Sequence, residues 1–366
     1  MTACTDADRA HMARALALAE RGLWTTTPNP RVGCVVLKDG AVIGEGFHAR
    51  AGEAHAEVAA LTDVRARGLD ARGATMYVTL EPCNHTGRTP PCSEAVIAAG
   101  IARVVVAMAD PHTVAGGGAE RLRAAGIAVD IGLMEGEARE LNLGFVSRVT
   151  RGRPWVRLKA AASLDGRTAL ANGESQWITG ESARLDGHRW RARACALLTG
   201  IGTVLQDDPQ LTVRGVGATR QPRRVVVDRH AQTPPSARIL ADGDALIFTA
   251  GERNPGWPAG VEVIALPDAD RRVDLAAMLA ELGRRGINEL HVEAGGRLNG
   301  ALFAAGLVDE VLLYFAPSLL GDPARGIAEF PGGLARLADR VTLSLRETTR
   351  VGDDLRIVAR VLSTKR

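Results

Sequence analysis

Apolar and polar positions along the chain follow helical and strand periodicities in turn. Residues 6–21 carry apolar side chains at helical spacing and end before Gly22, a typical helix stop. β-Branched runs at 32–38 and 41–47 flank an Asp-Gly pair, which predicts a hairpin. The same periodicities predict strands at 75–80, 103–108 and 127–131 and helices at 55–67, 92–99, 119–125 and 135–149. Strands alternate with helices, which is typical of a three-layer α/β domain.

A basic segment rich in helix breakers, at residues 151–154, interrupts this pattern. It predicts a joint between a domain over residues 1–147 and a second domain over residues 152–366. Beyond the joint the alternation starts again. It predicts strands at 155–161, 195–199, 224–228, 245–249, 289–293 and 308–316, helices at 180–194, 273–285 and 298–305, and a final hairpin within 340–362.

Composition narrows the class of protein. A chain of 366 residues is long enough for two domains at ~150 residues each. The 45 basic and 42 acidic residues give a formal net charge of +3, which argues against a nucleic-acid partner. No apolar run reaches membrane-spanning length, residues 1–8 show no secretory signal, and the five scattered cysteines argue against a disulfide framework. We therefore expect a cytoplasmic protein without a membrane partner.

Two short motifs, H-A-E and E-P-C, contain the residues with the clearest chemistry. The first places Glu57 two residues after His55, and the second supplies Cys83, with Cys92 further along. One imidazole and two thiolates would leave one open position on a tetrahedral Zn²⁺, which is the arrangement of catalytic sites. Glu57 could face the metal without binding it and transfer protons during hydrolysis. The two motifs together are the signature of zinc deaminases.

The alternatives are a structural zinc site, or a buried histidine with two core cysteines. A structural site usually has a fourth cysteine or histidine. Cys34 lies in an apolar strand pattern, and the loop histidines His48, His85 and His112 could compete as ligands. The carboxylate of Glu57 beside the motif histidine favours the catalytic interpretation.

Eight residues separate Cys83 from Cys92, whereas nucleoside and nucleic-acid deaminases usually have two. With this insert the sequence resembles the bifunctional riboflavin-biosynthesis deaminase/reductase family, over nearly the whole chain. The marks of the family are P-N-P-R-V-G at 28–33, H-A-E at 55–57, T-L-E-P-C at 79–83, P-P-C at 90–92, S-L-D-G-R at 163–167, E-S-Q-W-I-T at 174–179, D-D-P at 207–209, V-E-A-G-G at 292–296 and P-S-L-L-G at 317–321. One departure is the loop 110–116, which lacks a proline and one residue that the family usually has.

The resemblance implies a cytidine-deaminase-like fold for the first domain. It implies removal of the 2-amino group of 2,5-diamino-6-ribosylamino-4(3H)-pyrimidinone 5′-phosphate. Its zinc ligands and its proton shuttle fall on the four motif residues His55, Cys83, Cys92 and Glu57. It also assigns Asn29 to the pyrimidine base and Arg88 to the ribose phosphate, where an amide and a guanidinium offer suitable hydrogen bonds. Arg88 could equally be a solvated loop charge.

The second domain resembles dihydrofolate reductase in fold, and the family uses NADPH there to reduce the ribosyl chain to a ribityl chain. No G-x-G-x-x-G motif follows its first strand, so an ordinary dinucleotide-binding fold is not expected. The family's cofactor contacts fall on Ala161, Trp177, Thr203, Asp207, Gly295, Gly296, Arg297, Leu298, Asn299, Gly300 and Ala301. Its substrate contacts fall on Ser175, Arg191, Leu211, Arg214 and Glu293.

Several of these assignments have alternatives. Arg191 and Arg214 would clamp the 5′-phosphate, but Arg191 lies in a basic run that could be a solvated helix face. Trp177 could be a core aromatic residue, and Glu293 could be a structural acid. The Gly-Gly pair at 295–296 could be a simple turn instead of a pyrophosphate site at a helix start.

The sequence thus predicts a cytoplasmic two-domain enzyme of riboflavin biosynthesis, both a zinc hydrolase (deaminase) and an NADPH-dependent oxidoreductase. Its substrate would be a small pyrimidine ribose phosphate, and Lys159 or Asp165 could transfer the proton in the reduction. A nucleoside or tRNA-adenosine deaminase and a non-catalytic, zinc-stapled binding protein are the alternatives. We expect a dimer through the second domain, because strand 308–316 and the final hairpin could build a shared sheet.

Overall fold

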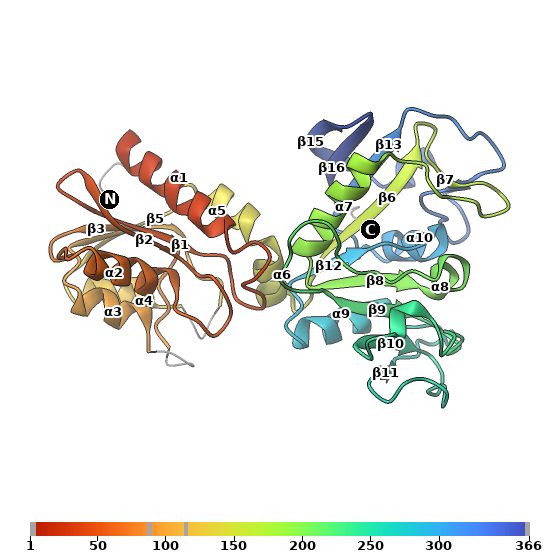
Figure 1. The fold of residues 1–366 in the computed structure, drawn as a ribbon, viewed down its shortest axis with the longest axis horizontal. Helices are drawn as coiled ribbons and strands as arrows, with labels where there is room; N and C mark the ends of the chain where they lie inside the picture. Colours follow the sequence, from red (N-terminus) through yellow and green to blue (C-terminus); the bar gives the residue numbers. More distant parts are fainter. Residues whose placement is uncertain (1–4, 86–89, 113–115, 363–366) are drawn as a thin grey trace. The chain divides into compact units, whose positions relative to one another are not determined.

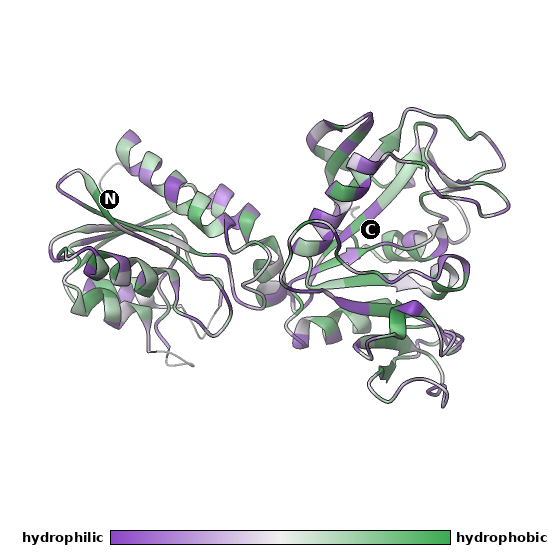
Figure 2. Ribbon diagram, in the orientation of Figure 1, coloured by the Kyte–Doolittle hydropathy of each residue, from purple (hydrophilic) through white to green (hydrophobic). Residues whose placement is uncertain are grey.

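The computed structural model describes residues 5–85, 90–112 and 116–362. The chain divides into two compact units, Met1–Gly152 and Arg153–Arg366, and the division falls within the breaker-rich segment 151–154. Each unit has its own sheet and its own apolar core (Figure 1). Figure 2 shows strands that are largely apolar, and helices that carry both apolar and polar faces.

The first unit is a sheet of five strands covered by helices on both faces. Its strands are β1 (Gly33–Lys38), β2 (Ala41–Phe47), β3 (Thr75–Leu80), β4 (Arg103–Met108) and β5 (Ala128–Ile131). Its helices are α1 (Asp6–Glu20), α2 (Ala56–Ala66), α3 (Cys92–Ala98), α4 (Gly118–Ala124), α5 (Glu135–Leu141) and α6 (Leu143–Arg151). The strand order is β2-β1-β3-β4-β5, antiparallel at β1 and parallel from β3 to β5. Helices α1 and α5 cover one face, and α2, α3 and α4 cover the other (Figure 1).

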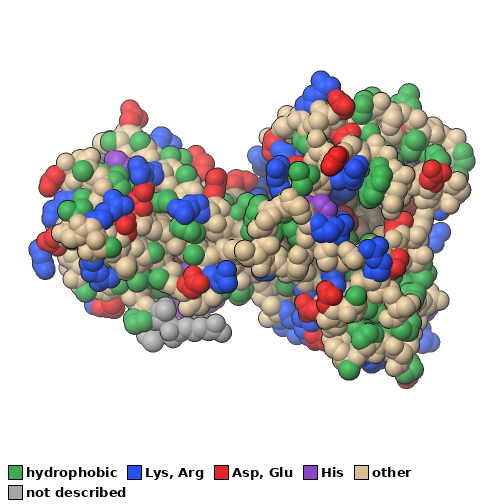
Figure 3. All heavy atoms as spheres, in the orientation of Figure 1, with side chains coloured by type: hydrophobic (Ala, Val, Ile, Leu, Met, Phe, Trp, Pro, Cys, Tyr) green, Lys and Arg blue, Asp and Glu red, His purple; other side chains and the backbone are tan. Residues whose placement is uncertain are grey.

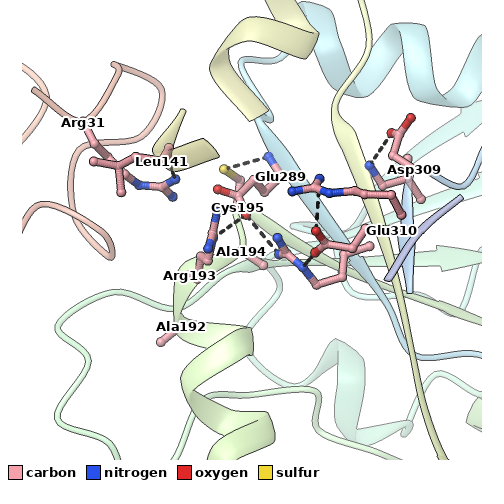
Figure 4. A network of polar contacts seen from close by, with 12 residues as sticks. Arg31, Leu141, Ala192, Arg193, Ala194, Cys195, Glu289, Asp309 and Glu310 are labelled. Carbon is pink, nitrogen blue, oxygen red and sulfur yellow. Dashed lines mark hydrogen bonds and ion pairs between the residues drawn. The ribbon is translucent and has the colours of Figure 1, made fainter. Parts of the chain in front are cut away.

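The single helix predicted over 135–149 is wrong, because the chain forms two helices that meet at Asn142. The Asn142 side chain accepts a hydrogen bond from the Arg31 amide at 2.8 Å and donates one to the Arg31 carbonyl oxygen at 2.9 Å. The Arg31 guanidinium donates to the Leu141 carbonyl oxygen at 2.7 Å (Figure 4). Asn142 therefore bonds to a segment far away in sequence, and this competes with a continuous helix.

Helix α2 lies close against β1 and β2 because glycine leaves room for it. A methyl group at Gly46 would lie 2.4 Å from the Ala60 nitrogen and 2.6 Å from the Ala56 carbonyl oxygen. Since α2 begins directly after His55 and carries Glu57 in its first turn, the depth of this helix sets the position of both side chains.

The second unit is a sheet of nine strands with order β11-β10-β9-β8-β12-β6-β13-β16-β15. Its strands are β6 (Trp155–Ser163), β8 (Ala196–Gly200), β9 (Arg223–Val227), β10 (Ala245–Thr249), β11 (Glu262–Ala265), β12 (Glu289–Val292), β13 (Glu310–Ala316), β15 (Leu343–Val351) and β16 (Asp354–Val361), and β7 (Arg167–Ala169) and β14 (Arg325–Gly326) form a separate ribbon. Its helices are α7 (Glu181–Arg193), α8 (Ile201–Asp207), α9 (Leu275–Arg284) and α10 (Gly296–Ala304), with short 3₁₀ turns at Arg238–Leu240 and Leu337–Asp339. Pairing is parallel from β11 to β13 and antiparallel at β16 and β15.

The carboxyl ends of three central strands meet at one edge of this sheet. β8, β12 and β6 are adjacent and parallel, so the segments that follow them converge. Helix α8 begins directly after β8, and Glu293 directly follows β12. Open α/β sheets bind their ligands at this edge. The periodicities did not predict α8 or β11, since both elements are short.

A buried charge network ties the middle strands together. The Arg157 guanidinium donates to a Glu289 carboxylate oxygen at 3.0 Å, bonds Glu310, and lies 4.6 Å from the centre of the Trp190 ring. Arg193 donates to the same Glu289 oxygen at 2.8 Å (Figure 4). Charges removed from water are stable only when paired, so the network favours one register of β12, β6 and β13.

We expect Gly46→Ala to destabilise the first unit by about 2 kcal/mol, because the added methyl group overlaps the α2 backbone. Hydrogen exchange of the β1 and β2 amides in the full chain would measure the change. Gly136→Ala is the matched control, because a methyl group at this α5 position meets open space. Equal exchange rates in the two variants would show that a methyl group at Gly46 does not lower the free energy of unfolding, and that α2 does not need glycine at this position.

Candidate active sites

His55, Cys83 and Cys92 come together in the first unit as a cluster of metal-binding side chains. His55 Nδ1 lies 3.2 Å from Cys92 Sγ and 3.6 Å from Cys83 Sγ, and all three ligand atoms lie within 4.8 Å of one another. Tetrahedral zinc with bonds of about 2.0 Å to nitrogen and about 2.3 Å to sulfur would separate these atoms by about 3.6 Å. The cluster therefore fits Zn²⁺ with three protein ligands.

Helix starts and a braced turn hold the three ligands. His55 is the N-cap of α2 and Cys92 is the first residue of α3, where the helix dipole favours a thiolate. Before Cys83, the Glu81 carboxylate accepts the amides of Asp110 at 3.1 Å and Ala119 at 2.9 Å. Glu81 thus fixes the turn after β3. The sequence motif contains this residue but does not indicate its bracing role.

Ser93 ties the segment after Cys83 to the start of α3. The Ser93 hydroxyl donates to Asn84 Oδ1 at 2.9 Å, and the Ser93 amide donates to the Cys83 carbonyl oxygen at 3.2 Å. The hydrogen bond from Cys92 and the interactions with His55 outweigh burial and together lower the pKa of the Cys83 thiol to about 4. A thiol with such a pKa is a thiolate at neutral pH and suits a metal ligand.

Glu57 lies beside the cluster with only 3% of its surface exposed. Burial raises the pKa of Glu57 to about 7, and the charges of Cys83 and His55 act on it in opposite directions. The carboxyl group can therefore both accept and donate a proton near neutral pH, which suits general acid–base chemistry.

His48 connects Asn29 to the cluster of metal-binding side chains, although the sequence indicated His48 only as a competing ligand. His48 is buried; its Nδ1 bonds the Ala54 carbonyl oxygen at 3.0 Å and its Nε2 bonds Asn29 Nδ2 at 3.0 Å. The His48 and His55 rings meet edge to face with centres 5.2 Å apart. His48 therefore orients the Asn29 amide. Arg88, the expected phosphate contact, lies outside the described residues.

Several of the expected cofactor residues of the second unit, among them Thr203, Gly295 and Leu298, lie at the strand-end edge of the sheet. A methyl group at Gly295 would lie 4.0 Å from Thr203 Oγ1, and one at Gly200 would lie 3.2 Å from the Leu298 side chain. The N-terminal turns of α8 and α10 therefore face each other. Trp177 is 69% exposed, and the Arg184 guanidinium lies over its ring, 4.7 Å from the ring centre. The alternative that Trp177 is a core aromatic residue is therefore wrong.

Two of the expected cofactor residues serve the packing of α10. A methyl group at Gly300 would lie 1.8 Å from the Glu329 carbonyl oxygen, so only glycine allows that segment to cross the helix. The buried Asn299 side chain donates to the carbonyl oxygens of Ala294 at 3.1 Å and Ile327 at 2.8 Å. Of the remaining expected residues, Ala161 lies in β6, Ser175 in the connection after β7, Asp207 at the end of α8, Leu211 in the loop after α8, and Arg297 and Ala301 in α10.

Arg191 and Glu293 form a two-pronged ion pair at the same edge. Arg191 binds both carboxylate oxygens, with Nη2 at 2.8 Å from Oε2, and donates through Nη1 to the Thr212 carbonyl oxygen at 3.1 Å. Burial opposes ionisation, but the Arg191 charge dominates and holds the pKa of Glu293 well below its usual range. The pair overturns the alternative of a solvated helix face for Arg191. Burial also lowers the pKa of Lys159, which interacts with both members.

Comparison with known proteins decides the family. Residues 154–357 match a family model described as RibD C-terminal domain, and residues 5–108 match the cytidine and deoxycytidylate deaminase zinc-binding region. The chain is 50% identical over 362 residues to riboflavin biosynthesis protein RibD of Escherichia coli strain K12, covering 95% of this chain and 98% of that protein. The chain belongs to the RibD family. The Haemophilus influenzae RibD protein is 45% identical, covering 96% of each chain.

Solved RibD structures share the whole architecture. Acinetobacter baumannii RibD (form 1) matches with a TM-score of 0.90 at 42% identity, covering 98% of this chain and 99% of that one. A Thermotoga maritima structure, named as a diaminohydroxyphosphoribosylaminopyrimidine deaminase/5-amino-6-(5-phosphoribosylamino)uracil reductase, matches with a TM-score of 0.89 at 36% identity, covering 97% and 99%.

RibD membership confirms the fold class predicted from the sequence, a cytidine-deaminase-like unit followed by the RibD reductase unit. It also confirms the predicted activities: the chain is a bifunctional deaminase and reductase of riboflavin biosynthesis, with zinc and NADPH as cofactors. The family therefore favours this enzyme over a nucleoside or tRNA deaminase and over a non-catalytic binding protein. None of the helices in the described residues combines the length and apolarity needed to cross a membrane.

Proposed function

We propose that the first unit deaminates 2,5-diamino-6-ribosylamino-4(3H)-pyrimidinone 5′-phosphate and that the second unit reduces the ribosyl chain of the product. The observation that carries the proposal is the buried Glu57 carboxyl beside a His-Cys-Cys cluster of zinc-binding geometry. The Thermotoga maritima structure is named for a deaminase of the diaminopyrimidine and a reductase of the aminouracil product, which supports these two substrates. Purified protein should release ammonia from the pyrimidine phosphate and then oxidise NADPH, and a protein that does neither would refute the proposal.

For deamination, we assign one role to each side chain of the first site. His55, Cys83 and Cys92 would hold Zn²⁺, which would supply the Lewis acidity that makes water nucleophilic at neutral pH. Water adds to C2 of the pyrimidine, the bond from C2 to the amino nitrogen breaks, and ammonia leaves. Glu57 takes the proton from water and delivers it to the departing nitrogen. Asn29, oriented by His48, would bind the edge of the pyrimidine.

For reduction, NADPH supplies the hydride. With NADPH bound, C1′ of the ribosylamine would accept the hydride, the bond from C1′ to O4′ would break, and O4′ would take a proton. We assign that proton to Lys159, because this half-buried lysine interacts with the ion pair of Arg191 and Glu293 and desolvation lowers its pKa. Asp165 is the poorer donor, since its carboxylate accepts the amides of Leu320 at 3.2 Å and Gly321 at 2.8 Å and thereby holds a turn.

We also propose that the protein is a dimer. β15 is the last strand of the sheet, so one of its sides has no neighbouring strand among the described residues. Leu345 on this strand is 66% exposed, and Leu337 before it is 81% exposed. Exposed leucines on and before an unpaired edge strand form a natural surface for pairing with a second copy. We place this dimer in the cytoplasm, where the zinc-binding thiolates stay reduced, and expect no nucleic-acid partner; recovery from an oxidising compartment would contradict this location.

Glu57→Gln should lower the turnover of deamination by about 10³-fold while zinc stays bound, because only the proton carrier is lost. Ammonia release and metal analysis would measure the two effects. Cys92→Ala is the matched control and should lose both zinc and deamination. Full activity of Glu57→Gln would remove this residue from the mechanism.

Lys159→Met should lower the turnover of NADPH oxidation by about 10²-fold or more, because the proposed proton source is lost. Ammonia release by the first unit should stay unchanged and would report that the protein is folded. Lys38→Met, in the first unit, is the control for the loss of a lysine. Normal NADPH oxidation by Lys159→Met would show that another group donates the proton to O4′.

Sedimentation equilibrium should give about twice the chain mass of 38.6 kDa. Leu345→Lys should shift the protein towards the monomer, because a charge on the shared edge would be buried without a partner. Leu69→Lys is the control, since Leu69 is exposed in the first unit. A monomeric wild-type protein would contradict the proposed dimer.

A further inference from the structure

The side chains of Arg191, Gln221 and His188 hold the loop that carries Arg214, and two of them, Gln221 and His188, were not among the expected site residues. Arg191 donates to the Thr212 carbonyl oxygen at 3.1 Å. Gln221 accepts the Val213 amide at 2.7 Å and donates to the Val213 carbonyl oxygen at 3.1 Å. The Arg214 amide donates to Nδ1 of His188 at 3.2 Å. The backbone of the loop is therefore fixed at three successive residues.

The contact with Arg214 determines the state of His188. A backbone amide can only donate, so Nδ1 of His188 must be the unprotonated nitrogen, and a neutral ring carries its proton on Nε2. The surroundings agree with a neutral ring: burial lowers the pKa of His188 to about 4, with Arg191, Arg214 and Lys159 acting in the same direction and Glu293 against them. His188 and Arg191 are three residues apart on α7 and share one face of that helix.

The charges around this loop are not balanced. Glu293 is occupied by both prongs of Arg191. In the described residues, no carboxylate pairs with the Arg214 guanidinium, which instead donates to Thr212 Oγ1 at 2.8 Å and Gln210 Oε1 at 3.3 Å. Figure 3 shows both basic and acidic side chains around a hollow on the surface of this unit. Since the Arg214 guanidinium has no carboxylate partner among the described residues, it suits a dianion such as a phosphate ester.

We propose that His188 is a positioning residue of the reductase: by accepting the Arg214 amide it fixes the loop that directs the Arg214 guanidinium at the 5′-phosphate of the substrate. This inference rests on the proposed reductase function. His188 would affect substrate binding through Arg214, and would contact neither the transferred hydride nor NADPH.

The experiment compares two substitutions that differ in one hydrogen bond. His188→Leu keeps a bulky side chain but removes the acceptor, whereas the amide oxygen of His188→Asn can replace Nδ1. His188→Leu should raise the KM for the phosphorylated substrate about tenfold, the equivalent of one lost hydrogen bond, with turnover and the KM for NADPH nearly unchanged. His188→Asn should recover most of this loss. Arg189→Leu, an exposed residue of the same helix, is the control.

Two further measurements separate positioning from a merely structural role. With the substrate lacking its 5′-phosphate, His188→Leu should change KM by less than twofold. In an Arg214→Ala background, His188→Leu should add nothing, because both substitutions remove the same interaction. Equal effects on both substrates, or additive effects with Arg214→Ala, would overturn the inference.

The outcomes also separate this inference from the function on which it rests. If Arg214→Ala leaves the KM for the phosphorylated substrate unchanged, the proposed phosphate site is wrong. If Arg214→Ala raises it and His188→Leu does not, the phosphate site stands and the role of His188 is refuted. Should leucine disturb the fold, seen as lost turnover at saturating substrate, His188→Ala makes the same comparison with His188→Asn.

Discussion

Both sites depend on one constraint of α/β architecture: parallel strands end at the same edge, so the segments that follow them meet there. In the first unit this geometry brings the turn after β3 against the turn after β4, where Glu81 accepts the Asp110 amide. In the second unit it brings Glu293, which follows β12, beside the end of β8, where the Glu293 amide donates to the Leu198 carbonyl oxygen at 2.8 Å. The remaining features of each site adjust charge and orientation at positions that the sheet has already set.

Two glutamates show how surroundings decide the role of a side chain. Glu57 is buried and has no arginine or lysine bonded to it among the described residues, so burial raises its pKa to about 7 and it can exchange protons. The Glu293 side chain is 15% exposed and bound by both prongs of Arg191, so it stays ionised. The first arrangement suits a proton carrier, and the second holds an arginine in place.

Two buried or half-buried histidines orient neighbouring groups through opposite ring nitrogens. His48 faces the Ala54 carbonyl oxygen with Nδ1, so Nδ1 carries the proton and Nε2 accepts from the Asn29 amide. His188 accepts the Arg214 amide with Nδ1, so its proton is on Nε2. In each unit the backbone selects the tautomer, and the selected tautomer restricts the group that would bind substrate.

The sequence by itself determined the alternation of strands and helices, the cluster of His55, Cys83 and Cys92, and the neighbouring Glu57, because each signal lies within a short segment. Only the tertiary structure decided that Asn142 divides the last helix of the first unit, that Gly300 packs against a crossing segment, and that His188 supports a distant loop. These contacts join residues far apart along the chain, and local periodicity carries no information about which distant backbone a side chain will meet. Local patterns therefore indicated the chemistry, while long-range packing set the orientation of the groups that would bind substrate.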